Sequence, residues 1–131
     1  MSDHPLVSVI IPAYNTAGYI ERCLQSVTEQ TLRDIEIIVI DDGSTDETAE
    51  VIGSFGTRIR SIRQANAGAS AARNAGIAAA TGRYIAFLDA DDYWLATKIS
   101  NQIKVFRAHP DLVLVSCGFA WERPNEQQSQ R

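Results

Sequence analysis

The chain has 131 residues, of which 45% are hydrophobic and 21% are charged, and its formal net charge is −4 at pH 7. The length fits one domain with a real core, and the composition excludes a fibrous, low-complexity or disordered chain. The negative charge argues against a general nucleic-acid or anionic-membrane surface, because both need clustered Lys and Arg. We therefore expect a soluble globular domain with no nucleic-acid partner.

The N-terminal segment, MSDHPLVSVIIP, has no basic region and only a short apolar run, so it predicts neither a signal peptide nor a membrane span. We expect a cytoplasmic protein, and we consider the inner face of the membrane for a full-length parent. Cys23 and Cys117 form no metal-ligand pattern and fall in apolar segments, so both are expected to be buried free thiols. His4 and His109 are expected to be structural or solvated.

Two hydrophobic periods alternate along the start of the chain. The β-branched run from Val7 to Ile11 predicts a strand that Pro12 closes. From Gly18 the period changes, and apolar residues spaced i, i+3, i+4 and i+7 predict a helix. These residues are Ile20, Cys23, Leu24 and Val27.

A second strand and a second helix are expected next. The run IEIIVI, residues 35–40, predicts the strand, and the sequence DDG, residues 41–43, signals a turn at its end. Ser44 and Glu47 fit a capping box, which predicts a short helix after the turn. The more polar segment 58–63 is expected to form an edge strand.

The remaining elements follow the same alternation. Residues 66–82 predict an Ala-rich helix whose small residues, Gly68, Ala72, Gly76 and Ala79, let its backbone lie close to a sheet. Residues 84–88 predict a strand, residues 95–106 an amphipathic helix and residues 112–115 a buried strand. Residues 121–131 have no apolar period and are expected to form a polar tail.

This alternation predicts an α/β fold over residues 1–120, a mostly parallel sheet with helices on both faces. In such sheets ligands bind at the carboxyl ends of the strands. Three strand ends carry polar loops, at residues 12–15, 41–43 and 89–92. They would bring together the carboxylates of Asp41, Asp42, Asp89, Asp91 and Asp92.

A cluster of this kind calls for a cation. Two carboxylates about 4 Å apart repel by roughly 4 kcal/mol at an effective dielectric near 20, so the cluster should be hydrated, split or bound to a cation. Mg2+ and Mn2+ prefer carboxylate oxygens and keep positions open for phosphate. We therefore predict a divalent metal here that recruits an anionic ligand. The competing interpretation is that these residues only cap helices and form turns.

Two further side chains have open roles at this edge. Tyr14 is either a partly buried aromatic or a ring that stacks on a planar base. Arg73, on the Ala-rich helix, either faces solvent or holds a carboxylate of the cluster or a phosphate with its planar guanidinium.

Four segments, in this order, resemble glycosyltransferase family 2, whose members are inverting enzymes with the Rossmann-like GT-A fold. They are VSVIIPAYN (7–15), VIDDGSTD (39–46), NAGASAARNAG (66–76) and GRYIAFLDADD (82–92). Each segment alone is a weak signal, but the four in order are specific. The resemblance extends to about Gly118.

The resemblance implies a donor-nucleotide site. Its residues would be Pro12, Ala13, Tyr14, Asn15, Asp41, Asp42, Gly68, Arg73, Asp89 and Ala90. Tyr14 would stack on the base, and Asp42, in preference to Asp41, would accept a hydrogen bond from the base edge. Arg73 and the Gly68 region would close over the nucleotide. Asp89 and Asp91 form a DxD pair that would hold Mn2+ or Mg2+, in which Asp89 would lie toward the ribose and Asp91 would bind the metal that bridges the diphosphate.

The implied reaction is inverting transfer of a sugar from a nucleotide diphosphate, commonly UDP, to a hydroxyl of a glycan, lipid-linked or other acceptor. Such enzymes serve polysaccharide or cell-envelope glycan synthesis. The base that deprotonates the acceptor normally lies beyond Arg131, so no catalytic residue is assigned and the chain corresponds to a truncated donor half. A sheet edge exposed by truncation could favour self-association.

Two other functions stay open. A non-catalytic nucleotide-binding or interaction module would keep the donor fold but transfer no sugar. A nucleotidyltransferase would favour a Gly-rich, basic phosphate loop after the first strand, and PAYNTAGY has neither feature.

Overall fold

The computed structural model describes residues 3–118 and 120. It forms two compact units, divided after Ser100. The first unit holds a sheet of four strands in the order β3-β2-β1-β4, and every neighbouring pair is parallel. The strands are β1 (Val7–Ala13), β2 (Ile35–Asp41), β3 (Arg60–Arg63) and β4 (Tyr84–Phe87).

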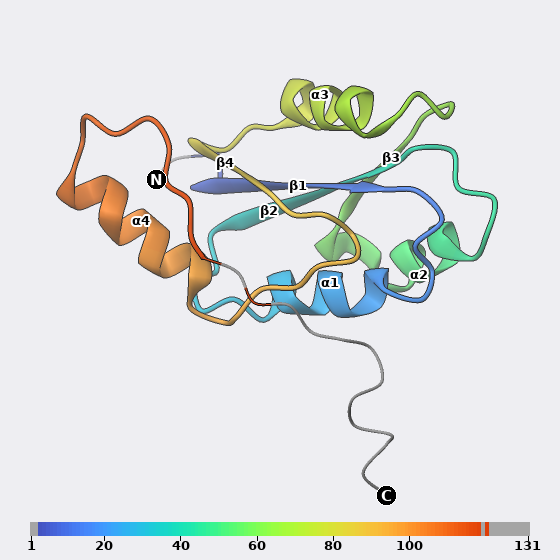
Figure 1. Cartoon of the computed structure of the whole chain (residues 1–131), viewed down its shortest axis with the longest axis horizontal. Coiled ribbons are helices and arrows are strands. Elements are labelled where there is room, and N and C mark those ends of the chain that lie inside the picture. The colour runs from blue at the N-terminus through green and yellow to red at the C-terminus, as the bar shows by residue number, and fades with distance from the viewer. Residues whose placement is uncertain (1–2, 119, 121–131) are drawn as a thin grey trace, which may run out of the picture. The chain divides into compact units, whose positions relative to one another are not determined.

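Helices cover both faces of this sheet. Figure 1 shows α3 (Ala69–Ala79) on one face and α1 (Ile20–Thr28) and α2 (Thr48–Ser54) on the other. A 3-10 turn, η1 (Gly56–Arg58), leads into β3, and α4 (Lys98–Ala108) begins at the end of the first unit and continues in the second. The predicted α/β fold with a parallel sheet is confirmed.

The core lies where the hydrophobic patterns place it. The two central strands are its centre, with Val9, Ile10, Ile38 and Ile40 all fully buried. The buried residues of α1 are the four that the spacing predicts, namely Ile20, Cys23, Leu24 and Val27. Runs of apolar residues on strands covered from both sides explain why β1 and β2 show no polar alternation.

Helix α3 lies very close to the sheet, as its small residues predict. A Cβ atom added to Gly76 would lie 2.3 Å from Cγ2 of Ile10, and Ala72 is fully buried against β2. Gly68 differs, since a Cβ there would meet nothing within 4 Å. Its φ of 97° is the reason for glycine at the start of this helix.

The predicted buried strand at residues 112–115 is wrong. No strand is assigned among the described residues after β4, and Val113 and Leu114 are 96% and 74% exposed. The run LVLV has the composition of a strand, but a strand also needs a neighbour to complete its hydrogen bonds. Cys117 is exposed, which corrects its expected burial, whereas Cys23 is buried as expected and both are free thiols.

Smaller differences concern the ends of elements. Strand β1 continues through Pro12 to Ala13, and β4 ends one residue earlier than predicted, at Phe87. The capping box is wrong, because α2 starts at Thr48 and the Ser44 hydroxyl accepts a hydrogen bond from Asn15 N–H instead. His4 and His109 are exposed. The predicted tail, 121–131, lies outside the described residues, and within them no helix has the length and apolarity to cross a bilayer.

Candidate donor and metal site

All four strands are parallel, so the loops that follow them gather at one edge of the sheet. Three of these loops are the ones predicted from the sequence. The fourth follows β3 and contains Gln64, which no sequence pattern marked, and Asn66, which was predicted to begin the Ala-rich helix but precedes α3. This loop supplies hydrogen-bond donors to Asp42, one of the two acidic residues after β2.

Asp42 is the most heavily bonded carboxylate of this edge. Its Oδ1 accepts hydrogen bonds from Gln64 Nε2 and Ala67 N–H, both at 2.9 Å, and its Oδ2 accepts one from Gly68 N–H at 2.9 Å. Asn66 donates to the Asp42 carbonyl oxygen at 3.1 Å and to Oδ2 at 3.3 Å. The residue is only 3% exposed. These bonds, that of Gln64 first, hold the pKa of Asp42 below its ordinary value.

Asp41 is equally enclosed, at 1% exposure. Its Oδ1 accepts a hydrogen bond from Ser44 N–H at 2.9 Å, and its Oδ2 pairs with Arg63 Nη1 at 2.8 Å. Arg63 also donates to the Ser44 carbonyl oxygen. Both acidic residues after β2 therefore stabilise the surrounding loops, as the turn interpretation of the sequence suggested.

The loop after β1 is tied to the loop after β2. Asn15, at a φ of 50°, accepts hydrogen bonds at Oδ1 from Thr45 N–H at 2.8 Å and Asp46 N–H at 3.3 Å. Ala13 is buried, and its carbonyl oxygen accepts a bond from Asp42 N–H. Asn15 and Ala13 thus hold this loop in place and leave the Tyr14 side chain between them 48% exposed.

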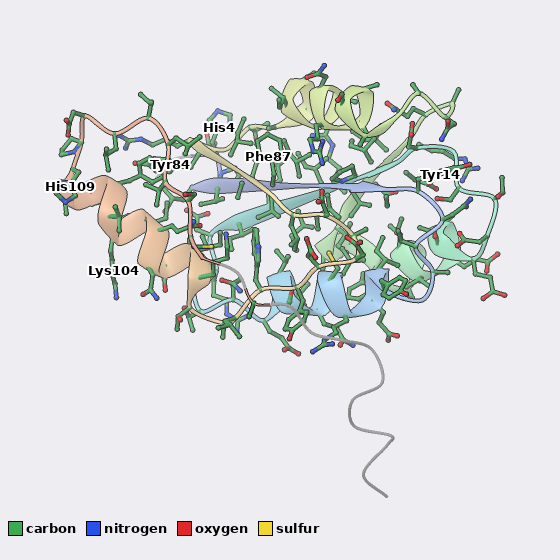
Figure 2. All side chains as sticks on the ribbon, viewed as in Figure 1. His4, Tyr14, Tyr84, Phe87, Lys104 and His109 are labelled. Carbon is green, nitrogen blue, oxygen red and sulfur yellow. The ribbon has the colours of Figure 1, made fainter. Side chains whose placement is uncertain are left out.

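Tyr14 has the placement that a stacking ring needs. Figure 2 shows it on the loop that follows β1, while Tyr84 lies at the start of β4, at the opposite end of the sheet. An exposed ring on a loop held by its neighbours could stack on a planar ligand without a rearrangement of the backbone.

The loop after β4 contains the exposed acidic cluster, defined here as Asp89, Asp91 and Asp92. All three side chains are exposed, and one carboxylate oxygen from each lies within 4.8 Å of the others. Asp92 N–H donates to the Asp89 carbonyl oxygen at 3.0 Å, which closes a tight turn, and Ala90 is buried inside it. Desolvation, with the charges of Asp91 and Asp89, raises the pKa of Asp92.

Arg73 points to this cluster from α3. Its Nη2 donates to Asp89 Oδ1 at 3.0 Å, and the two side chains are 38% and 53% exposed. Of the two roles open for Arg73 in the sequence, contact with a carboxylate of the cluster is therefore the observed one. Gly68 lies at the start of the same helix, beside Asp42.

Two residues of helix α1 contact the acidic loop after β4. The Cys23 thiol donates to the Asp89 carbonyl oxygen at 3.6 Å, and Arg22 stacks on the Tyr93 ring, with its Cζ 3.7 Å from the ring centroid. Burial, together with the charges of Asp92, Asp91 and Asp89, raises the pKa of Cys23 to about 12. No spacing in the sequence links Cys23 to Asp89, so periodicity predicts its burial but not this contact.

Gln30, just beyond α1, fixes the segment after the cluster. It is 1% exposed, its Nε2 donates to the Leu95 carbonyl oxygen at 2.7 Å, and its Oε1 accepts a bond from Ile99 N–H at 3.2 Å. A buried amide with both ends bonded holds its neighbours in one arrangement. Contacts with the α1 region thus hold the acidic turn on both sides, through Cys23 at Asp89 and through Gln30 at Leu95 and Ile99.

The donor set of the exposed acidic cluster fits a hard divalent cation. It offers only carboxylate oxygens, which Mg2+ and Mn2+ favour over softer ligands, and its exposure leaves positions for water or phosphate oxygens. The enclosed pair Asp41 and Asp42 does not fit such an ion, because its oxygens already accept hydrogen bonds or pair with Arg63.

The fold and this acidic edge define a GT-A-like α/β domain. The model of the family described as "Glycosyl transferase family 2" matches residues 8–130, and the chain belongs to that family. It is 51% identical over 100 residues to the UDP-Glc:alpha-D-GlcNAc-diphosphoundecaprenol beta-1,3-glucosyltransferase WfaP of Escherichia coli, with 75% of this chain and 40% of that enzyme covered. Other curated glycosyltransferases are covered to about a third of their length.

Solved structures agree with the fold. TarS 1-349 from S. aureus, in complex with UDP-GlcNAc, has a TM-score of 0.73 and 28% identity, covering 79% of this chain and 32% of TarS 1-349. The mannosyltransferase PcManGT from Pyrobaculum calidifontis, in complex with GDP-Man and Mn2+, has a TM-score of 0.67 and 29% identity, covering 80% of this chain and 33% of its own. The predicted family and GT-A fold are confirmed.

Proposed function

We propose that this chain is the donor-binding part of an inverting glycosyltransferase and that it binds a nucleotide-diphosphate sugar, with UDP as the preferred nucleotide. The observation that carries the proposal is the exposed acidic cluster, three carboxylates within 4.8 Å at the carboxyl edge of the sheet, with Arg73 beside it. WfaP is named for a UDP-Glc donor and TarS was solved with UDP-GlcNAc, which supports the nucleotide.

In this proposal Asp91 and Asp89 hold Mn2+ or Mg2+, as the Mn2+ in the PcManGT complex supports. When bound, the metal supplies positive charge that stabilises the leaving diphosphate. Tyr14 stacks on the base and Arg73 stabilises phosphate charge. Asp42 places Gly68 and the start of α3 through backbone bonds, and a base edge would reach Asp42 by replacing the Gln64 amide.

We further propose that the acceptor hydroxyl belongs to a glycan or a lipid-linked sugar, the latter supported by the diphosphoundecaprenol in the name of WfaP. Such an acceptor would place the full-length protein at the inner face of the membrane. The base that takes the acceptor proton is not assigned to any residue of this chain. Sugar transfer by a longer protein would separate this function from that of a non-catalytic nucleotide-binding module.

The test is a calorimetric titration of UDP into the chain, with and without Mn2+. We expect binding that needs the metal and that weakens at least about tenfold in Asp91→Ala, because a ligand carboxylate is lost. Asp34→Ala is the matched control, since Asp34 is exposed and precedes β2, at the other end of the sheet. Equal UDP binding by Asp91→Ala and the control would contradict the proposed metal site.

A further inference from the structure

Arg73 and a divalent cation would compete for one carboxylate. The guanidinium already contacts Asp89 Oδ1 at 3.0 Å, and the oxygens of Asp89, Asp91 and Asp92 that suit a metal lie within 4.8 Å of one another. A metal on this cluster would therefore come within a few ångströms of the guanidinium. Like charges at that distance repel, so occupancy by the metal weakens the pairing of Arg73 with Asp89.

The ion pair between Arg73 and Asp89 can break without a change in the fold. Its side chains are 38% and 53% exposed, and an ion pair as exposed as this is weak because water screens the two charges. The backbone of Arg73 is held in place, however, because Arg73 lies on α3 and the start of this helix is fixed. Asp42 accepts hydrogen bonds from Ala67 and Gly68 N–H immediately before α3. The guanidinium can therefore leave Asp89 by rotation of its side chain while the helix stays in place.

We propose that Arg73 is a counter-ion of the exposed acidic cluster and that it moves from Asp89 to the donor diphosphate when the metal binds. This inference rests on the proposed function, since it assumes that the exposed acidic cluster holds the metal. Arg73 would balance the acidic charge before the metal arrives and the phosphate charge afterwards. Metal binding and diphosphate binding then become coupled through one side chain.

Opposite effects on the two ligands distinguish this role from a simple structural one. Removal of Arg73 frees Asp89 and removes a nearby positive charge, so Mn2+ alone should bind roughly two- to fivefold more tightly. UDP at saturating Mn2+ should bind roughly tenfold more weakly, because a charge-assisted bond to phosphate is lost. A merely structural arginine would weaken both.

The experiment measures free Mn2+ by electron paramagnetic resonance in titrations of the wild type and Arg73→Gln, followed by calorimetry with UDP. Arg83→Gln is the matched control, because it removes the same charge just before β4, whereas the cluster follows that strand. It should change neither affinity. Arg73→Lys keeps the charge without the planar fork and should bind Mn2+ as the wild type does, but UDP more weakly.

The outcomes separate the two proposals. A folded wild-type chain that binds no Mn2+ overturns the metal site and this inference together. A wild type that binds Mn2+, with Arg73→Gln unchanged or weaker for Mn2+, overturns the counter-ion role alone. Tighter Mn2+ binding without a loss of UDP affinity overturns the movement of Arg73 to the diphosphate.

Discussion

Two groups of acidic residues follow β2 and β4, the strands on either side of β1, and they differ in exposure and in hydrogen bonding. Asp41 and Asp42, after β2, are 1% and 3% exposed, and their oxygens accept bonds from backbone and side-chain donors. The exposed acidic cluster after β4 has its three carboxylates in solvent and close to one another. The sequence of each group, Asp residues at the end of an apolar strand, is nearly the same.

The difference lies in the donors that the fold supplies. Gln64 and the backbone of Ala67 and Gly68 surround Asp42 and lower its pKa, whereas partial desolvation and the neighbouring carboxylates raise the pKa of Asp92. A carboxylate whose lone pairs accept hydrogen bonds stabilises the fold. Carboxylates that mainly face each other remain available to a cation.

The largest expected effect on stability is that of Asp42→Ala. Three donors lose their acceptor, namely Gln64 Nε2 and two backbone N–H groups just before α3, while Asn66 keeps its bond to the carbonyl oxygen of residue 42, so Tm should fall by about 5–10 °C. Asp91→Ala removes an exposed carboxylate and should leave Tm within about 2 °C of the wild type. Thermal unfolding followed by circular dichroism measures both, and equal losses would remove the distinction between the two groups.

The pH dependence of stability should show the same contrast. The folded-state pKa of Asp42 is lowered, so its contribution is complete above the ordinary Asp pKa of about 3.9 and is lost as the pH falls through the lower folded value. Urea midpoints of the wild type and Asp42→Asn should therefore differ at pH 7 and converge in strong acid. A difference that grows as the pH falls would show the opposite sign of shift.

Burial, together with the nearby acidic cluster, should also suppress the reactivity of the Cys23 thiol. Cys23 is fully buried and its pKa is raised to about 12, whereas Cys117 is exposed. Titration with an aromatic disulfide at pH 8 should modify one thiol of the folded chain, and both after denaturation. Cys117→Ser should abolish the reaction of the folded chain, and rapid modification of that variant would contradict the packing of Cys23 under Asp89.

The smallest expected effect is on self-association, and it concerns the two edge strands of the sheet, β3 and β4. Edge strand β3 carries Arg60 and Arg63, whereas edge strand β4, YIAF, has no charge and leaves Ile85 and Phe87 42% and 46% exposed. Weak self-association through β4 is therefore our proposal. Phe87→Lys should lower the apparent mass at high concentration in light scattering, and Arg60→Gln serves as the control at the other edge.

The sequence predicted the features that depend on local patterns. The spacing of Ile20, Cys23, Leu24 and Val27 predicted the buried side of α1, and the parallel strand ends predicted where the acidic groups gather. The family resemblance gave Asp42 and Asp91 different roles, but the residue pattern alone could not distinguish them, because the donors to Asp42 come from Gln64 and beyond, more than twenty residues along the chain. The run at 112–115 misled for a related reason, since its strand pattern specifies no neighbour.

Gly76 gives the site a dependence on packing that its charges do not reveal. The missing side chain lets α3 lie directly on Ile10, and Arg73 is three residues earlier on the same helix. The separation between α3 and the sheet at this contact therefore affects the distance between the Arg73 guanidinium and the acidic cluster. A single methyl group at position 76 would lift the helix and change the reach of Arg73, so affinity for a charged ligand could be altered by a substitution that changes no charge.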